Sequence, residues 1–144
     1  MTGGPAAFVD RLRRATNDHD LEAVAECFAA DYRNETPVHP ERGFSGREQV
    51  RRNWTQIFAA IPDVTTDVIR CAVDGDTVWT EWEHRGTRPD GSRHVMRGVV
   101  IFGVVDDRAA WARFYLEPVL EPVPGTGGGI DETVRRQVSQ GGPS

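Results

Sequence analysis

A polar stretch between residues 78 and 102 carries the side chains best suited to moving protons. Successive side chains of a strand point to opposite faces, so Glu81 and Glu83 share one face while Trp82 and His84 share the other. Two carboxyl groups at this spacing repel each other in a partly dry site, and one of them then keeps its proton near neutral pH. Such a pair suits general acid–base chemistry. A strand face that is turned to water accounts for the same pattern.

The histidine on the following strand is the natural partner for these acids. If the intervening turn centres on residues 89–90, Glu83 pairs near Met96, and Glu81, Glu83 and His94 lie on one face. A histidine beside a carboxylate can act as a general base. We therefore predict Glu83, His94 and Glu81 as catalytic residues, with Glu83 and His94 exchanging protons. The alternative is that His94 is only a polar neighbour in a hairpin.

The elements that would position these residues follow from the hydrophobic period. Helical spacing covers residues 8–16 and 21–28, with Asp20 as the cap of the second helix. A short strand at residues 31–38 precedes a helix at 45–61, whose start carries Ser45 and Glu48 as a predicted capping box.

The period changes to two from Val64 onward. Turn residues at Asp74-Gly75, in RPDG and at Asp106-Asp107 separate four strands, which predicts an antiparallel meander. Helices followed by strands indicate an α+β domain over residues 1–120. Residues 121–144 are rich in Pro and Gly and are expected to form an extended arm, within which residues 130–138 could make two helical turns.

Composition limits the classes of function. The 144-residue chain has a net charge of −5, which argues against a nucleic-acid surface, and no apolar run is long enough to span a membrane. The N-terminus lacks the apolar core of a secretory signal. Two cysteines without metal-like spacing are read as buried free thiols, so we expect a cytoplasmic protein. The histidines lack paired spacing for a metal, and we expect no metal and no cofactor.

Four segments, taken in order, resemble the nuclear transport factor 2-like superfamily. They are NDHDLEAVAECFAADYRNETP, FSGREQVRRNWTQIFAAIPDV, VDGDTVWTEWEHRGTRPDGSRHVMRGVVIF and RFYLEP. The resemblance extends over about residues 6 to 120. The chain looks most like the branch of SnoaL-like polyketide cyclases and limonene epoxide hydrolases. The resemblance implies a cone-shaped α+β barrel with an internal pocket. In this fold a curved, mostly antiparallel sheet wraps around the N-terminal helices. It also implies a small hydrophobic or amphiphilic ligand and a homodimer formed through the outer sheet face.

The chain departs from this family at two places. Where the epoxide hydrolase branch carries Arg-x-Asp, the alignment places Glu81 and Glu83, and Phe114 stands where both branches have a reactive acid. Phenylalanine cannot move a proton, so we expect neither epoxide hydrolysis nor the usual cyclisation. Glu117 is interpreted as a strand-end acid that pairs with an arginine.

The predicted ligand-binding residues combine polar strand positions with apolar side chains. Asn34 and Thr36 match positions where relatives contact a ligand or water, and both can hold a hydroxyl group. Trp54 lies on the apolar stripe of a predicted helix. We expect it to be mainly a core residue and, in addition, to form part of a cavity wall. The full set is Asn34, Thr36, Trp54, Phe58, Trp79, Met96 and Phe114.

Three functions remain open on the sequence. The first is a small-molecule-binding domain which, if it is an enzyme, transfers protons as an isomerase, cyclase or dehydratase on a small apolar or polyketide-like ligand. The second is a non-catalytic ligand-binding or dimerisation module, which Phe114 favours. The third is a scaffold for a protein partner that uses the sheet face bearing Trp82. The predicted homodimer places Trp82 and Val78 at its interface, on the face opposite the glutamates.

Overall fold

The computed structural model describes residues 3–120 and 129–140. Along the chain the elements are α1 (Pro5–Asn17), α2 (Leu21–Glu26), β1 (Phe28–Glu35), the 3-10 helix η1 (Pro40–Arg42), β2 (Phe44–Ser45), α3 (Arg47–Ala60), β3 (Thr65–Asp74), β4 (Thr77–Thr87), β5 (Arg93–Val105), β6 (Arg108–Pro118) and α4 (Ile130–Gln140). Helix α4 confirms the helical turns predicted near the C-terminus. Residues 121–128 and 141–144 of the predicted arm lie outside the described residues.

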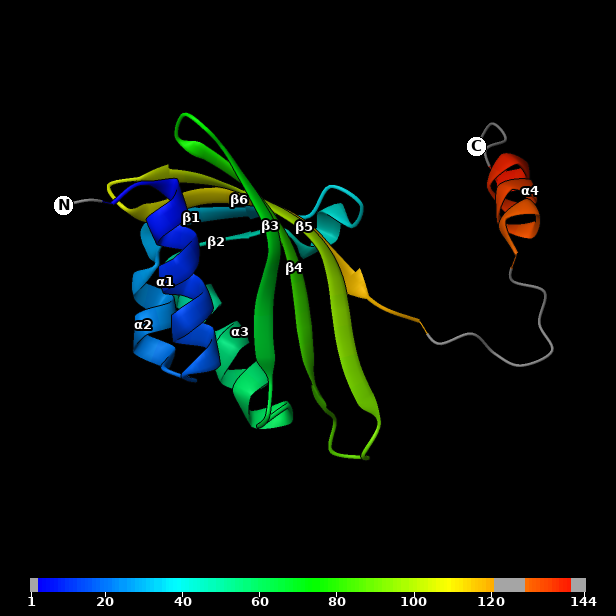
Figure 1. Ribbon diagram of the computed structural model, residues 1–144, viewed down its shortest axis with the longest axis horizontal. Coiled ribbons are helices and arrows are strands. Elements are labelled where there is room, and N and C mark those ends of the chain that lie inside the picture. Colours follow the sequence, from blue (N-terminus) through cyan, green and yellow to red (C-terminus); the bar gives the residue numbers. More distant parts are fainter. Residues whose placement is uncertain (1–2, 121–128, 141–144) are drawn as a thin grey trace.

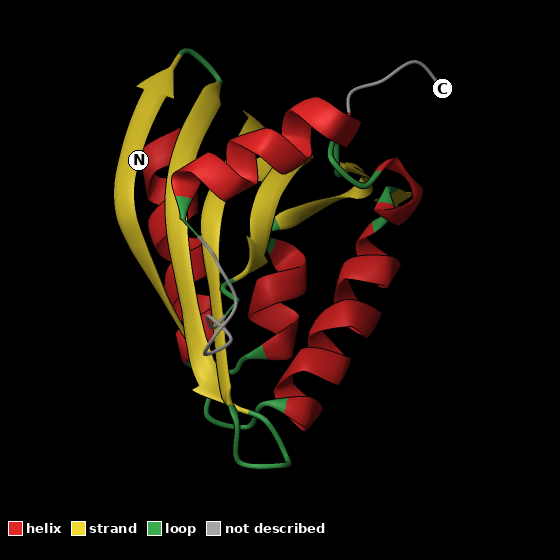
Figure 2. Cartoon of the chain, turned by 90° about the vertical axis from the view of Figure 1, so that its right-hand side faces the viewer, coloured by secondary structure: helices red, strands yellow, loops and turns green. Residues whose placement is uncertain are grey.

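The six strands form one curved sheet in the order β2-β1-β6-β5-β4-β3. Neighbouring strands are antiparallel except β1 and β6, which run parallel. The sheet does not close, because β2 and β3 are its two edges. It bends around α1, α2 and α3, which lie on its concave side (Figures 1 and 2). The predicted α+β fold with a cone-like curved sheet and a four-stranded meander is thereby confirmed.

Of the two helix caps predicted from the sequence, the structure contains one. Asp20 caps α2 as predicted, because its carboxylate accepts a hydrogen bond from the Ala23 amide at 3.1 Å. The capping box predicted for α3 is wrong. Ser45 belongs to β2, where it pairs with Arg33, and α3 starts after Gly46 without a side-chain cap.

The core lies between α1 and the inner face of the sheet. Phe8 and Phe102 are buried and meet edge to face, with ring centroids 5.0 Å apart. Val78 and Trp82 also point inward, with 0% and 3% of their surface exposed. Burying a side chain of this size stabilises a fold by about 1.5–3 kcal/mol. The sequence prediction that Trp82 and Val78 form a partner-facing surface is therefore wrong, since both belong to the core.

The hairpin of β4 and β5 has a register one residue away from the predicted one. The structure pairs Glu83 with Arg97 and His84 with Met96, whereas the prediction paired Glu83 near Met96. The loop spans residues 88–92 and closes with the Arg88 amide donating to the Ser92 carbonyl at 2.9 Å. Because side chains alternate, a one-residue slip exchanges the faces. Residues Trp82, His84 and Met96 thus face inward, and the glutamates of β4 face outward.

Gly98 lies where β5 passes closest to β6. A Cβ atom at this position would lie 2.1 Å from the Tyr115 carbonyl oxygen, which is a backbone atom and cannot move aside. We predict that Gly98→Ala lowers the free energy of unfolding by about 1–3 kcal/mol, measured by urea titration. Gly129→Ala is the matched control, because the space around Gly129 is open. Equal stability of the Gly98 variant and the wild type would contradict this account of the sheet.

Candidate ligand-binding pocket

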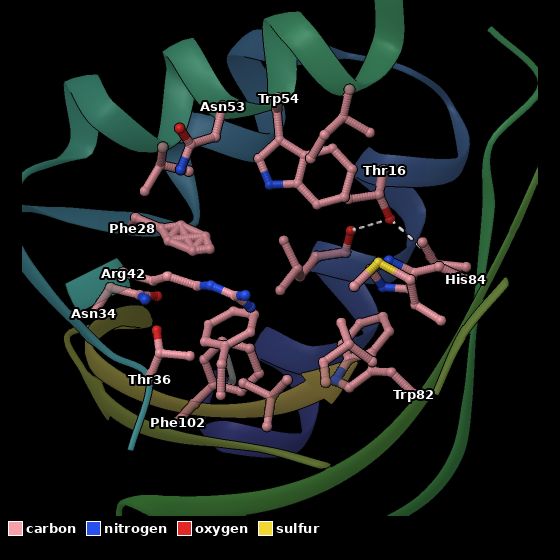
Figure 3. Close-up of a pocket in the computed structure, with 18 of the residues that line it drawn as sticks. Thr16, Phe28, Asn34, Thr36, Arg42, Asn53, Trp54, Trp82, His84 and Phe102 are labelled. Atoms are coloured by element: carbon pink, nitrogen blue, oxygen red, sulfur yellow. Dashed lines mark hydrogen bonds between the residues drawn. The ribbon is translucent and has the colours of Figure 1, made fainter. Parts of the chain in front are cut away.

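A cavity of about 280 Å³ opens between the inner sheet face and α3. This is close to the lower end of the range of roughly 300–1,000 Å³ that is typical of small-molecule sites. Aromatic side chains from five different strands and α3 form much of its wall, as Figure 3 shows in part. They are Phe28, Tyr32, Phe44, Trp54, Trp82, Phe102 and Phe114. The wall is therefore suited to an apolar molecule.

His84 is a titratable group in this wall. It lies on β4 between Thr66 of β3 and Met96 of β5, and its ring is 6.2 Å from that of Trp54 and 6.0 Å from that of Trp82. Burial among these groups, with a smaller contribution from the charge of His94, lowers the pKa of His84 from 6.5 to about 4.

The His84 ring is accordingly neutral at pH 7. Among the described residues, neither of its nitrogens makes a hydrogen bond, and the ring lines the cavity. A neutral imidazole can accept a proton at one nitrogen and donate a hydrogen bond from the other. The ring is thus available to a molecule in the pocket.

Tyr32 and Asn34 form a buried polar pair on β1. The Tyr32 hydroxyl donates to the Asn34 side-chain oxygen at 2.6 Å, and both residues line the cavity. Burial raises the pKa of Tyr32, so the phenol stays protonated and keeps donating. This hydrogen bond holds the Asn34 amide in one orientation, with its oxygen toward Tyr32 and its amino group without a partner among the described residues.

Charged residues gather at one part of the lining. Arg42 comes from η1 and Glu117 from the end of β6, and their closest side-chain atoms are 3.7 Å apart. His39 Nε2 lies 3.2 Å from the other oxygen of Glu117. The expectation that Glu117 pairs with an arginine is confirmed, although the residue also lines the pocket. Asn53 of α3 adds a further polar group.

The three predicted catalytic residues are not brought together in the pocket. Glu83 lies on the outer sheet face, where Arg85 and Arg97 donate to its carboxylate at 2.8 and 2.6 Å and lower its pKa. Glu81 is exposed on the same face. His94 is on the inner face with Met96, close enough to affect the pKa of His84, but it is not part of the cavity wall. The register shift explains this arrangement.

The predicted ligand-binding residues fall into two groups. Five of them line the cavity: Asn34, Thr36, Trp54, Met96 and Phe114. Phe58 stands behind this wall, with its ring stacked on His19 at a centroid distance of 4.7 Å. Trp79 is 51% exposed and lies outside the cavity lining.

Sequence reasoning missed His84, Tyr32, Arg42 and Asn53. His84 was placed on the face of Trp82, which was predicted to meet a partner subunit, and Tyr32, which is only 1% exposed, was not selected. One sequence signal could have identified His84. It lies on the same strand face as Val78, Thr80 and Trp82, and a face with these side chains is expected to pack against the helices. Arg42 and Asn53 are brought in by a loop and a helix face, for which no such pattern exists.

Neither a metal-binding cluster nor a membrane-spanning helix is found in the part of the chain that the structure describes. Within residues 3–120 and 129–140, no cluster of His, Cys, Asp or Glu is placed to hold a metal ion. None of the helices described is long and apolar enough to cross a membrane. Of the two cysteines expected to be buried, both are free, but only Cys27 is buried, while Cys71 is exposed.

This chain belongs to the SnoaL-like family, because the sequence model of the SnoaL-like domain matches residues 9–112. The match runs from within α1 to the first part of β6, so it includes the pocket lining except Phe114, Leu116 and Glu117. The assignment confirms the resemblance to the nuclear transport factor 2-like superfamily. None of the curated proteins that were compared with the chain matches it.

Solved structures share the fold. A candidate ketosteroid isomerase from Kribbella flavida is 26% identical with a TM-score of 0.62, and the match covers 83% of this chain and 82% of that one. A loop truncation variant of IdmH is 27% identical with a TM-score of 0.65, covering 78% and 91%. SalBIII, an epoxide hydrolase/cyclase-like enzyme of pyran ring formation in salinomycin, is 21% identical with a TM-score of 0.68, covering 80% and 90%.

Proposed function

We propose that this chain binds a small, largely apolar molecule in the pocket and transfers a proton on it, with His84 as the base. The observation that carries the proposal is a neutral imidazole, without a hydrogen-bond partner among the described residues, in the wall of an apolar cavity. Asn34, Thr36, Trp54, Met96 and Phe114 are the proposed ligand contacts. The candidate ketosteroid isomerase among the similar structures supports an isomerase-type or cyclase-type reaction.

The chemistry that suits this arrangement is removal of a proton from carbon next to a carbonyl group. His84 would accept the proton, and the donors of Asn34 and Arg42 would stabilise the charge that develops on the carbonyl oxygen. A pKa of about 4 makes His84 a weaker base than free imidazole. An enzymatic base with a pKa of about 4.6 is nevertheless sufficient for this kind of step.

The test is proton exchange in heavy water. The protein is incubated with a small aryl ketone such as 2-acetylnaphthalene, and NMR follows the loss of the protons next to the carbonyl. The proposal expects exchange faster than in buffer alone and saturable with ketone concentration. Binding without any acceleration would instead favour a non-catalytic ligand-binding module. Phe114 supports that second function, because it places an apolar ring in the wall where relatives carry an acid.

We also propose that two copies pair through the outer sheet face. This face carries Trp79 and Tyr115, which are 51% and 37% exposed. Val99 of β5 lies on the same face, where it pairs with Glu81 of β4 and with Tyr115 of β6. A stable dimer would bury more than about 1,000 Å² there. Trp79→Arg should convert a dimer into a monomer in sedimentation velocity, whereas Val38→Arg, at a 63% exposed loop position, should not. A wild-type chain that sediments as a monomer would refute the dimer.

A further inference from the structure

Both amide side chains in the pocket have unused N–H donors, while their oxygens already accept one hydrogen bond each. The Asn34 side-chain oxygen already accepts from Tyr32 at 2.6 Å, and the Asn53 side-chain oxygen accepts from Gln49 at 2.8 Å. Within the described residues, neither amide nitrogen donates to another protein group, and both residues line the cavity. The groups without a partner at this part of the wall are therefore N–H groups, which seek oxygen acceptors.

Arg42 adds a positive charge to the same part of the wall. Figure 3 shows its side chain extending into the cavity from the side on which Asn34 and Thr36 lie. The nearest carboxylate oxygen, on Glu117, is 3.7 Å from Arg42 Nη1, which is too far for a hydrogen bond. No other partner for the guanidinium is found in the described part of the chain. An arginine presents a planar pair of donors that fits a carboxylate with two parallel hydrogen bonds.

Glu117 is the carboxylate that a ligand anion would meet in this lining. Its Oε1 lies 3.2 Å from His39 Nε2, so it has a partner besides Arg42. Arg42 can therefore turn toward a ligand while Glu117 keeps its contact with His39. The remaining negative charge of Glu117 opposes an anionic ligand, and its removal should favour one.

We infer that the ligand of this pocket is an apolar molecule that ends in a carboxylate, which Arg42 binds together with the amide donors of Asn34 and Asn53. This inference rests on the proposed function, because it takes the cavity as the ligand site, and it adds the chemical class of the ligand. The apolar body would lie against Trp54, Trp82 and Phe102, and the carboxylate would lie at the Arg42 side of the cavity.

The test compares acids with neutral molecules of the same shape. The pairs are benzoate with acetophenone, 2-naphthoate with 2-acetylnaphthalene, and decanoate with 2-undecanone, each titrated into the full-length protein by calorimetry at pH 7. In each pair a carboxylate oxygen is replaced by a methyl group. For the pair that fits the cavity, we expect the acid to bind about 10- to 100-fold more tightly than the ketone.

Three variants locate the effect. Arg42→Gln should weaken acid binding far more than ketone binding and so remove the preference for the acid, and measurable ketone binding by this variant shows that the pocket is intact. Glu117→Gln should strengthen acid binding about two- to fivefold. Arg135→Gln on α4 makes the same change in net charge, and its ion pair is with Glu132, so it should alter neither affinity.

The outcomes separate the inference from the proposed function. The inference is wrong if the ketones bind as tightly as their acids, or if Arg42→Gln keeps the full preference for the acid. Either result is still compatible with an apolar ligand-binding pocket. If no member of any pair binds to the wild type, the proposed function fails, and the inference fails with it.

Discussion

Lowering the pH from 7 to 4 should destabilise the wild-type chain by about 3 kcal/mol more than it destabilises a His84→Gln variant. The pKa of His84 is about 4 in the folded chain, against an ordinary value of 6.5. Between these values the unfolded chain binds a proton that the folded chain does not, so stability falls as the pH decreases through this window. The stabilising state is the neutral ring, which is fully present above pH 6.5.

Urea titrations at several pH values measure this difference. Acids with lowered pKa values, such as Asp63 and Glu83, lose their contribution in both proteins, so it cancels in the comparison. His94→Gln is the control for the cause. Burial is the larger reason for the low pKa of His84, and the charge of His94 is the smaller one, so His94→Gln should keep most of the effect. Parallel pH profiles for the wild type and His84→Gln would contradict the buried neutral ring.

The His84→Gln substitution should also reduce ketone proton exchange by about 10²- to 10⁴-fold, the usual contribution of a general base. Glutamine is polar and of similar size, but it has no nitrogen that accepts a proton. The affinity for 2-acetylnaphthalene should change little, because the apolar wall of the cavity remains. The loss should therefore appear in the rate constant and not in the half-saturating concentration.

Glu83→Gln is the control for this experiment. Its carboxylate lies on the outer sheet face in contact with Arg85 and Arg97, so exchange should continue at the wild-type rate. If Glu83→Gln abolishes exchange and His84→Gln does not, the catalytic residue is Glu83, as predicted from the sequence, and the role proposed for His84 is wrong.

The sequence was sufficient for most of the helices and strands and for their order, but it did not predict η1 or β2. The change of period from 3.6 to 2 near Val64, together with the turn residues, predicted the meander of β3 to β6. These signals are local, because each depends on residues close together in the chain. The family resemblance supplied the curvature of the sheet, which no local pattern specifies.

The site depended on one residue of hairpin register. The RPDG sequence is compatible with a loop centred between Pro89 and Asp90 or on Asp90 itself, and the structure has the second. The choice determines whether His94 and Met96 share a face with Glu83 or with His84. Which of these two faces is turned to the helices is a separate question. The decisive evidence is tertiary: α1 and α3 cover the face that bears Val78 and Trp82, which excludes water from it. Local turn residues contain no information about that covering.

The central claim is that His84 is a neutral base in contact with the ligand site, and NMR of the histidine rings tests it most directly. The ring proton of His84 is assigned by its absence in His84→Gln, and its chemical shift is followed against pH with and without 2-acetylnaphthalene. The account predicts a midpoint near 4 in the free protein and a shift of the signal when the ketone is added. A midpoint near the ordinary value of 6.5, with no response to any of the probe ligands, would contradict it.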